Sequence, residues 1–211
     1  TKPLGAMHGD PAGSVLGDRV HLDARIESLD DLDADAIVVA TPPRESARLL
    51  DEEPPELEDS PIVSVHLWFA ERLLPTPLAA LLGTDAHWIF DRGALTAHRP
   101  ERGQYLTVVS SGVPELLEIR GRELVDRIAA QVTERLGDAE LLWSRVSREP
   151  YATIALRPGT HRPGVETTKD GVVRAGTWTD TGWPATMESA VRSGRRAAQH
   201  LLSVPHAKVR A

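Results

Sequence analysis

The segment richest in residues that could do chemistry runs from Ala175 to Ala198 and reads AGTWTDTGWPATMESAVRSGRRAA. Val172 and Val173 lead into it as a short apolar strand, and a glycine and a proline then redirect the chain into a helix beginning near Ala185. The first amides of such a helix lack intrahelical partners and lie at its positive end, so they stabilise an anion. The pattern predicts a ligand-facing helix in a buried position. Its small and apolar residues would pack closely on a neighbour: Ala190, Val191, Gly194, Ala197 and Ala198.

Other patterns that carry chemistry are weak or missing. The chain has no cysteine, which excludes disulfides, cysteine-ligated zinc and iron–sulfur clusters. Its histidines show neither His-x-x-x-His nor His-Glu-x-x-His spacing, so solvated or core roles are favoured over a metal site. No Gly-x-Ser-x-Gly elbow occurs. This interpretation applies to His66, His87, His98 and His161.

A charged pair, Asp91 and Arg92, ends the run HWIFDR. At the end of a strand that faces a lipid cavity, such a pair could orient a substrate hydroxyl, which makes these two residues the weak catalytic candidates. A simple surface ion pair is the alternative interpretation.

Composition limits the class of protein. The chain has 211 residues, 41% of them hydrophobic, which is enough for one large domain or two small ones. The net charge of -7 argues against general nucleic-acid binding. Without a run of 18 apolar residues or an opening signal peptide, we expect neither a membrane span nor export, and cytoplasm is the default compartment.

The chain reads as three regions. From Val20 to Leu50, VHLDARIESL and DADAIVVATPP predict two strands, and RESARLL predicts a short helix opened by Pro43. An acidic linker follows. The middle region predicts antiparallel strands at IVSVHLWF, HWIF and YLTVVS, and a strand in LLWSRVSREPYATI that Pro150 interrupts. Between them we expect one amphipathic helix over 115–136, ended by Gly137 in the left-handed conformation.

The first segment resembles the carboxyl-terminal flavin-binding signature of the FAD-dependent amine oxidase and phytoene desaturase superfamily. The matching residues are Gly176, Thr177, Met187, Glu188, Ala190, Gly194 and Ala197. The likeness is greatest to the squalene-associated branch of that superfamily, and it extends over most of the chain from about Val20. It rests on WTDTGWPATMESAVRSG, LLPTPLAALLG, HWIFDR and LLWSRVSREPYATIALRPG.

The resemblance implies an α/β (α+β) fold, in which pieces of an FAD-binding Rossmann-like domain flank an antiparallel-sheet substrate domain with helices. The expected bounds are 1–55 and 163–211 for the FAD-binding part and 56–162 for the substrate-binding domain. The superfamily's Gly-x-Gly-x-x-Gly turn has no counterpart, because the early glycines are spaced by four. We therefore expect the chain to be the carboxyl-terminal portion of a longer enzyme, with the missing amino-terminal half as its partner.

The same resemblance implies a set of FAD contacts. Thr177 departs from the pattern, because many members have an acidic residue there; Asp180 could replace that acid, or it could simply form a turn. The strand that includes Ile26 would contact the adenine. Trp178 and Trp183 would wall the flavin or the substrate channel, with packing of the loop as the alternative. The complete set is Ile26, Gly176, Thr177, Trp178, Asp180, Gly182, Trp183, Ala185, Thr186 and Met187.

The implied activity is that of an FAD-dependent oxidoreductase acting on an isoprenoid or other hydrophobic small molecule. In the squalene-associated branch, reduced flavin delivers a hydride equivalent as the allylic hydroxyl of a hydroxylated squalene precursor leaves, giving squalene. A carotenoid or phytoene desaturase, or an amine oxidase, is the alternative enzyme. A non-catalytic fragment that binds a hydrophobic ligand without FAD is the alternative of another class. The expected location is cytoplasmic, with peripheral membrane contact left open.

Overall fold

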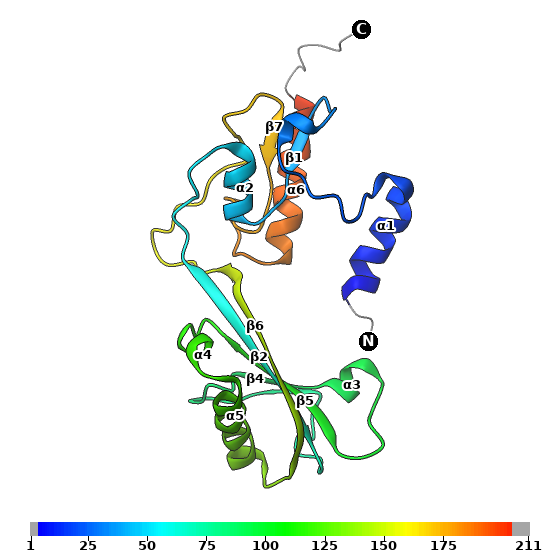
Figure 1. Ribbon diagram of the computed structural model, residues 1–211, viewed down its shortest axis with the longest axis vertical. Coiled ribbons are helices and arrows are strands. Elements are labelled where there is room, and N and C mark those ends of the chain that lie inside the picture. Colours follow the sequence, from blue (N-terminus) through cyan, green and yellow to red (C-terminus); the bar gives the residue numbers. More distant parts are fainter. Residues whose placement is uncertain (1–3, 204–211) are drawn as a thin grey trace. The chain divides into compact units, whose positions relative to one another are not determined.

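The structure is a computed structural model that describes residues 4–203 (Figure 1). The chain forms two compact units, each described here by itself. The five-stranded unit contains the residues up to Leu22 together with Ser60–Ala152. The two-stranded unit contains Asp23–Asp59 and the residues from Thr153 on. The predicted mixture of helices with an antiparallel sheet is confirmed.

The five-stranded unit is built on one sheet with strand order β3-β4-β5-β2-β6. Strand β5 pairs antiparallel with β2 and with β4, and β3 pairs antiparallel with β4. In β2 the odd-numbered residues from Pro61 to Phe69 are buried and the intervening ones are more exposed, as the period of a strand with one covered face requires. The bounds are β2 Asp59–Phe69, β3 Leu78–Ala80, β4 Trp88–Asp91, β5 Gln104–Ser111 and β6 Leu141–Ile154.

Helix α5, Gly121–Leu136, covers one face of this sheet. Its buried stripe, with Leu124, Ile128 and Val132, packs in one cluster with the buried side chains of β2 and β5. The single helix expected over 115–136 is wrong: α4 spans Glu115–Glu118, and Ile119 with the N-cap residue of α5 is extended. Gly137 ends α5, but with φ 116° and ψ 162° it does not adopt the left-handed helical conformation expected of it.

Strand β6 runs without a break through Pro150, so the predicted interruption is wrong. The strand lies at the edge of the sheet, where a proline whose missing N–H points away from the neighbouring strand removes no ladder hydrogen bond. The remaining helix of the sheet region is α3, Arg92–Thr96. Near the amino terminus, the π-helical turn Gly5–Gly9, α1 at Asp10–Leu16 and the turn Gly17–Arg19 bury no residue.

The two-stranded unit contains β1, Ile37–Val39, and β7, Val172–Arg174, which pair in parallel. This confirms that the two end regions of the sequence share a sheet. Helix α2, Pro43–Leu50, follows β1 as predicted, and Leu49 and Leu50 form a small core with Leu29 and Val39. Leu29 belongs to the 3₁₀ turn Leu29–Asp31.

The strand predicted in VHLDARIESL is wrong, because residues 20–28 form irregular backbone. Asp23 has φ 55°, which breaks an extended conformation, and most of the segment is exposed. The alternating pattern is typical of a strand with one covered face, but in the part of the chain that the structure describes no strand pairs with this segment.

Helix α6, Met187–Ser203, begins two residues later than expected. Its buried residues recur every fourth position at Ser189, Ser193 and Ala197, so the packed stripe is mostly polar. The small-residue face predicted to be buried is largely exposed: Ala190, Val191, Gly194 and Ala198.

The two units correspond only in part to the expected domain bounds of 1–55, 56–162 and 163–211. Residues up to Leu22 group with the five-stranded unit, and residues 153–162 group with the two-stranded one. Assigning the units to cofactor and substrate remains a prediction. No helix in the part of the chain that the structure describes is long and apolar enough to cross a membrane.

Candidate functional site

The carboxyl ends of β1 and β7 lie at the same edge of their sheet, because the two strands are parallel and in register from Ile37 opposite Val172. The amide of Ala175 extends this ladder by donating to the carbonyl of Val39 at 2.9 Å. Beyond the strands, the Thr41 loop and the loop 175–186 leave this edge together. Ligands of open α/β sheets bind at such an edge, so these two loops form the candidate site.

Trp178 locks the two loops to each other. Its indole N–H donates to the carbonyl of Thr41 at 3.1 Å, and the side chain is buried. The ring lies so close to Gly176 that an added Cβ there would be 2.4 Å from Trp178 Nε1, and Gly176 has φ +155°. Glycine is therefore required by this packing. The placement supports the packing interpretation of Trp178 and corrects its assignment as a wall of a ligand channel.

Hydroxyl groups hold the loop against α6. Ser193 Oγ accepts from the amide of Gly176 at 2.9 Å, and Ser189 Oγ lies 2.7 Å from Thr181 Oγ1. The Ser189 hydroxyl also approaches the carbonyl of Thr177 at 3.3 Å. These bonds explain why the buried stripe of α6 carries serines: they satisfy polar groups of the loop that burial would otherwise leave unpaired.

Arg162 is a second support that the sequence analysis missed. Its guanidinium donates to the carbonyls of Trp183, at 2.9 Å, and Thr177, at 3.4 Å, and its side chain is 11% exposed. It also lies 3.7 Å from a carboxylate oxygen of Asp180. The residue stands outside the motif in sequence, in HRPG, so only the folded loop reveals its role.

Asp180 shapes the turn. Its Oδ1 accepts from the amide of Gly182 at 3.1 Å, and its carbonyl accepts from Arg196. This is an Asx turn, so the structure favours the turn-forming interpretation of Asp180 over a direct cofactor contact.

The exposed part of the loop consists of the residues that lead into α6. Gly182 has φ +67°, and no atom lies within 4 Å of the place of its missing Cβ. The ring of Trp183 stacks with Arg192, whose guanidinium carbon is 4.4 Å from the ring centroid. Thr186 and Met187 are exposed and Ala185 is partly so. These five predicted cofactor contacts form an accessible rim, Gly182–Met187, and the side chain of Asp180, 62% exposed, is accessible as well.

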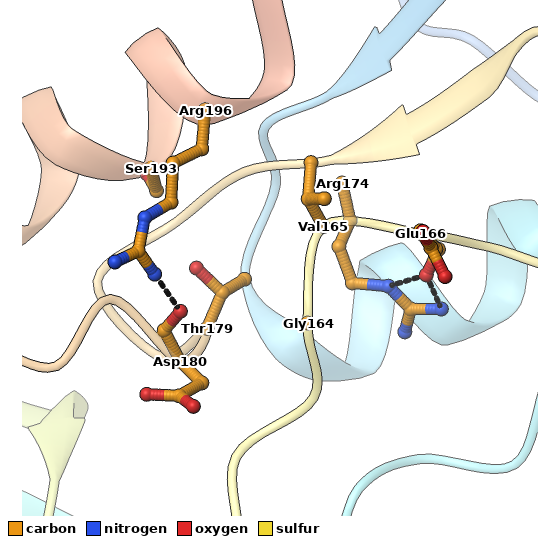
Figure 2. Close-up of a pocket in the computed structure, with 8 residues that line it drawn as sticks. All are labelled: Gly164, Val165, Glu166, Arg174, Thr179, Asp180, Ser193 and Arg196. Carbon is orange, nitrogen blue, oxygen red and sulfur yellow. Dashed lines mark hydrogen bonds between the residues drawn. The ribbon is translucent and has the colours of Figure 1, made fainter. Parts of the chain in front are cut away.

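A cavity of about 470 Å³ lies in the same unit, between α6 and the segment 164–166 (Figure 2). Arg174 and Arg196 line it, but both are engaged. Arg174 pairs with Glu52 at 2.8 Å and with the carbonyl of Glu166, while Arg196 donates to the Asp180 carbonyl. Asp180 is the one predicted site residue among its eight lining residues. The cavity is therefore distinct from the exposed rim described above.

Ile26 lies in the irregular segment before α2, packed against the small core of Leu29, Val39, Leu49 and Leu50. Its carbonyl accepts a hydrogen bond from Arg48 at 2.9 Å. The strand predicted at Ile26 is therefore wrong, and its contact with an adenine ring stays a prediction.

Asp91 and Arg92 lie in the five-stranded unit. Asp91 is 3% exposed; its Oδ1 accepts from the Ala94 amide at 3.0 Å, capping α3, and its Oδ2 accepts from Gln104 Nε2 at 2.8 Å. The ion pair that the structure describes joins Asp91 to Arg72 at 3.7 Å. Neither interpretation of the Asp91–Arg92 pair matches this placement, because the carboxylate is a buried structural group. Arg92 is exposed.

The rim residues fit an anionic, aromatic cofactor. The amides that open α6 are at an exposed helix start, and Gly182 leaves its side-chain volume open. The hydroxyl of Thr41, at the end of β1, is buried without a hydrogen-bond partner, which is a group that a bound ligand could satisfy. No group of three or more His, Cys, Asp or Glu side chains suited to a metal occurs among residues 4–203.

Comparison with known proteins agrees with this fold. Residues 14–202 match the family described as flavin containing amine oxidoreductase. Hydroxysqualene dehydroxylase of Rhodopseudomonas palustris is 34% identical over 176 residues, covering 82% of this chain and 40% of that protein. The enzyme of the same name from Sinorhizobium fredii is 35% identical over 172 residues, covering 80% of this chain and 39% of that protein. The chain thus spans about two fifths of these relatives.

Solved structures show the fold. A putrescine oxidase structure, described as bound to putrescine, superposes with a TM-score of 0.61 at 16% identity, covering 91% of this chain and 51% of that one. A structure described as a putative protoporphyrinogen oxidase from Exiguobacterium gives 0.61 at 13% identity, covering 81% and 42%. The chain belongs to the flavin containing amine oxidoreductase family. The predicted superfamily, and with it FAD as cofactor and oxidoreductase chemistry, are confirmed as properties of that family.

Proposed function

We propose that the chain is the carboxyl-terminal part of a longer FAD-dependent oxidoreductase that removes the hydroxyl group of hydroxysqualene to give squalene. The observation that carries the cofactor half of this proposal is the exposed rim, Gly182–Met187. This rim lies at the carboxyl edge of two parallel strands, where ligands of such sheets bind. The relatives named hydroxysqualene dehydroxylase, at 34–35% identity over about four fifths of the chain, support the substrate.

In this proposal the amides near Thr186 and Met187 stabilise negative charge on the flavin edge, and Thr41 donates its otherwise unpaired hydroxyl. Trp178 and Arg162 hold the loop in the shape that exposes those amides. Reduced FAD bound there would supply the hydride for the reaction. The overall change would replace a carbon–oxygen bond with a carbon–hydrogen bond, and the oxygen would leave as water after gaining a proton. An apolar substrate of this size partitions into bilayers, so contact of a cytoplasmic enzyme with the membrane surface is part of the proposal.

Flavin titration tests the cofactor half. The 211-residue chain should bind FAD weakly or not at all, because several phosphate contacts, worth roughly 1.5 to 3 kcal/mol each, would belong to the remainder of the enzyme. The full-length enzyme should purify yellow. Tight, stoichiometric FAD on the 211-residue chain would refute the claim that the site needs the remainder.

Two variants of the full-length enzyme locate the flavin. Gly182→Val places a β-branched residue at φ +67°, and Ala185→Val adds bulk at the helix start, so each should reduce flavin content sharply. Gly194→Ala, on an exposed face of α6, is the matched control and should keep the normal spectrum. Product analysis with hydroxysqualene then tests the reaction. If both valine variants keep their flavin, the loop does not face the cofactor.

A further inference from the structure

The face of the five-stranded sheet opposite α5 is lined by aromatic side chains. The covered face carries the buried core with α5, whereas the outward positions of β2, β4 and β6 carry three indoles that are 37%, 47% and 47% exposed. Large, partly exposed aromatic groups gathered on one face usually mark a binding surface. We call this the aromatic face, and its members include Trp68, Trp88, Phe90, Tyr105 and Trp143.

The aromatic face has a polar centre. His66 on β2 is directly opposite Thr107 on β5, and Thr107 is directly opposite Phe90 on β4. His66 Nδ1 lies 3.0 Å from Thr107 Oγ1 and 3.2 Å from the hydroxyl of Tyr105. The Tyr105 ring in turn meets Trp143 edge-on, at a centroid distance of 6.2 Å. Three polar groups therefore converge within a largely apolar surface.

This convergence holds the His66 ring in place. Two hydroxyl groups meet at Nδ1, which can accept from a hydroxyl when unprotonated or donate to hydroxyl oxygens when protonated. Burial lowers the pKa of His66, and the charges of Arg92 and Arg145 lower it further, so the ring is neutral at pH 7. In either tautomer Nε2 can bond an alcohol: its N–H donates to the oxygen, or its lone pair accepts the hydroxyl proton. Tyr105 and Thr107 keep the ring in position through Nδ1.

We propose that the aromatic face binds the hydrocarbon chain of an isoprenoid alcohol, and that His66, positioned by Tyr105 and Thr107, forms a hydrogen bond with its hydroxyl group. The choice of an isoprenoid alcohol rests on the proposed function. Arg92 and Arg145, the charged neighbours of His66, make the surroundings positive, which favours the oxygen of a hydroxyl group and disfavours a cationic ligand such as an amine.

The consequence is discrimination between substrate and product. A ligand that carries the hydroxyl satisfies the polar centre, whereas the hydrocarbon left after dehydroxylation covers the centre without pairing with it. A site built to hydrogen-bond a hydroxyl rejects the analogue that lacks it, because its own polar groups lose their water without gaining a partner. His66 thus acts as a specificity residue that favours release of the hydrocarbon.

Ligand binding to the 211-residue chain tests this inference, with farnesol and its deoxygenated hydrocarbon as the matched pair of probes. Tryptophan emission reports binding, because three indoles line the face. The unmodified chain should bind farnesol about 10-fold more tightly than the hydrocarbon, the value of roughly one net hydrogen bond. His66→Phe should abolish this preference while leaving hydrocarbon binding unchanged. Tyr105→Phe, which keeps the ring against Trp143, should reduce the preference by a smaller factor.

Ser64→Ala is the control. Ser64 lies two residues before His66 on the same face of β2, and its variant should keep the full preference. Equal affinity of the unmodified chain for both probes would overturn hydroxyl recognition. In the full-length enzyme, acrylamide quenching measures how exposed the indoles are. Indoles that acrylamide does not quench and that do not respond to farnesol would overturn the proposal, because another part of the protein then covers the face. Flavin content and turnover of the full-length His66→Phe variant are measured alongside. If both are normal and the KM is unchanged, this inference is rejected while the proposed function remains intact.

Discussion

The two units of the chain are stabilised in different ways. The five-stranded unit buries fourteen hydrophobic residues in one cluster between its sheet and α5, whereas the two-stranded unit has two smaller clusters, with four and three buried hydrophobic residues. In the second unit, hydrogen bonds that involve Ser189, Ser193, Arg162 and Trp178 hold the main loop. Apolar burial is the dominant stabilising term, so the unit with the candidate cofactor loop has the weaker core of its own.

The difference indicates how binding and stability are linked. A small core with a polar loop opens locally at low free energy, and a ligand that binds the folded form adds RT ln(1 + [L]/Kd) to its stability. We therefore expect the two-stranded unit to depend on the cofactor and the five-stranded unit to fold independently of it.

The largest effect is expected for Gly176→Val. Its Cβ would lie 2.4 Å from the indole of Trp178, so the bond from Trp178 to Thr41 and the loop packing would both be disrupted. We expect a loss of about 3 kcal/mol in the free energy of unfolding of the two-stranded unit. Hydrogen exchange should rise in β1, β7 and α6 while β2 and β5 stay protected.

Gly194→Ala serves as the control for that experiment. Gly194 is a helical glycine with no atom within 4 Å of an added Cβ, so alanine should leave the unit unchanged or stabilise it by up to about 1 kcal/mol. Loss of protection in both units upon Gly176→Val would contradict the independence of the five-stranded unit.

A smaller effect, confined to the other unit, is expected for Asp91→Ala. The substitution removes the cap of α3 and one of the groups that bind the Gln104 amide, whose oxygen accepts from the amides of Leu73 and Leu74. We expect a loss of about 2 kcal/mol in the five-stranded unit, measured by urea unfolding. Asp91→Asn should recover part of it. An unchanged midpoint would show that the Gln104 network does not need the carboxylate.

The smallest expected effect is a pH dependence at Asp85. Burial raises the pKa of Asp85, but hydrogen bonds from Arg127 and Gln131, each 2.7 Å from Oδ2, lower it below the usual 3.8. A carboxyl with a lowered folded-state pKa stabilises the fold above pH 4 and loses that contribution as pH falls through the folded pKa.

Unfolding of the unmodified chain between pH 5 and pH 3, compared with Asp85→Asn, measures this contribution. We expect the variant to lose about 1 kcal/mol at neutral pH and to show a flatter acid profile. Identical slopes for the two proteins below pH 4 would eliminate Asp85 as their source.

Elements with a strong period or clear end signals could be predicted from the sequence. The alternation in IVSVHLWF gave β2, and Pro43 opened α2 as expected. Gly176 is recognised from the sequence as part of the flavin signature, and in the structure the Trp178 indole packs against it. The rim residues of the loop are also named from the sequence and are accessible in the structure, and their contact with the cofactor stays a prediction.

What could not be predicted depends on partners that are distant in the sequence. Arg162 is separated from Trp183 by a strand and a loop, and the pairing of His66 with Thr107 requires the register of β2 on β5. From the sequence, Asp91 can be taken for a surface charge. Its partner Gln104 on β5 comes close only when β5 pairs with β4, and its partner Ala94 only when α3 forms. The alternating pattern at VHLDARIESL misled because alternation alone does not supply a neighbouring strand.

Pro150 in β6 has a consequence for how the protein behaves before it is fully assembled. The open edge of a sheet is a template on which other chains can add strands and aggregate. On β6, Arg145 and Glu149 are exposed charged residues near the proline, and charges with a missing N–H discourage such addition. We therefore expect β6 to limit aggregation of a newly made chain while its aromatic face is still exposed.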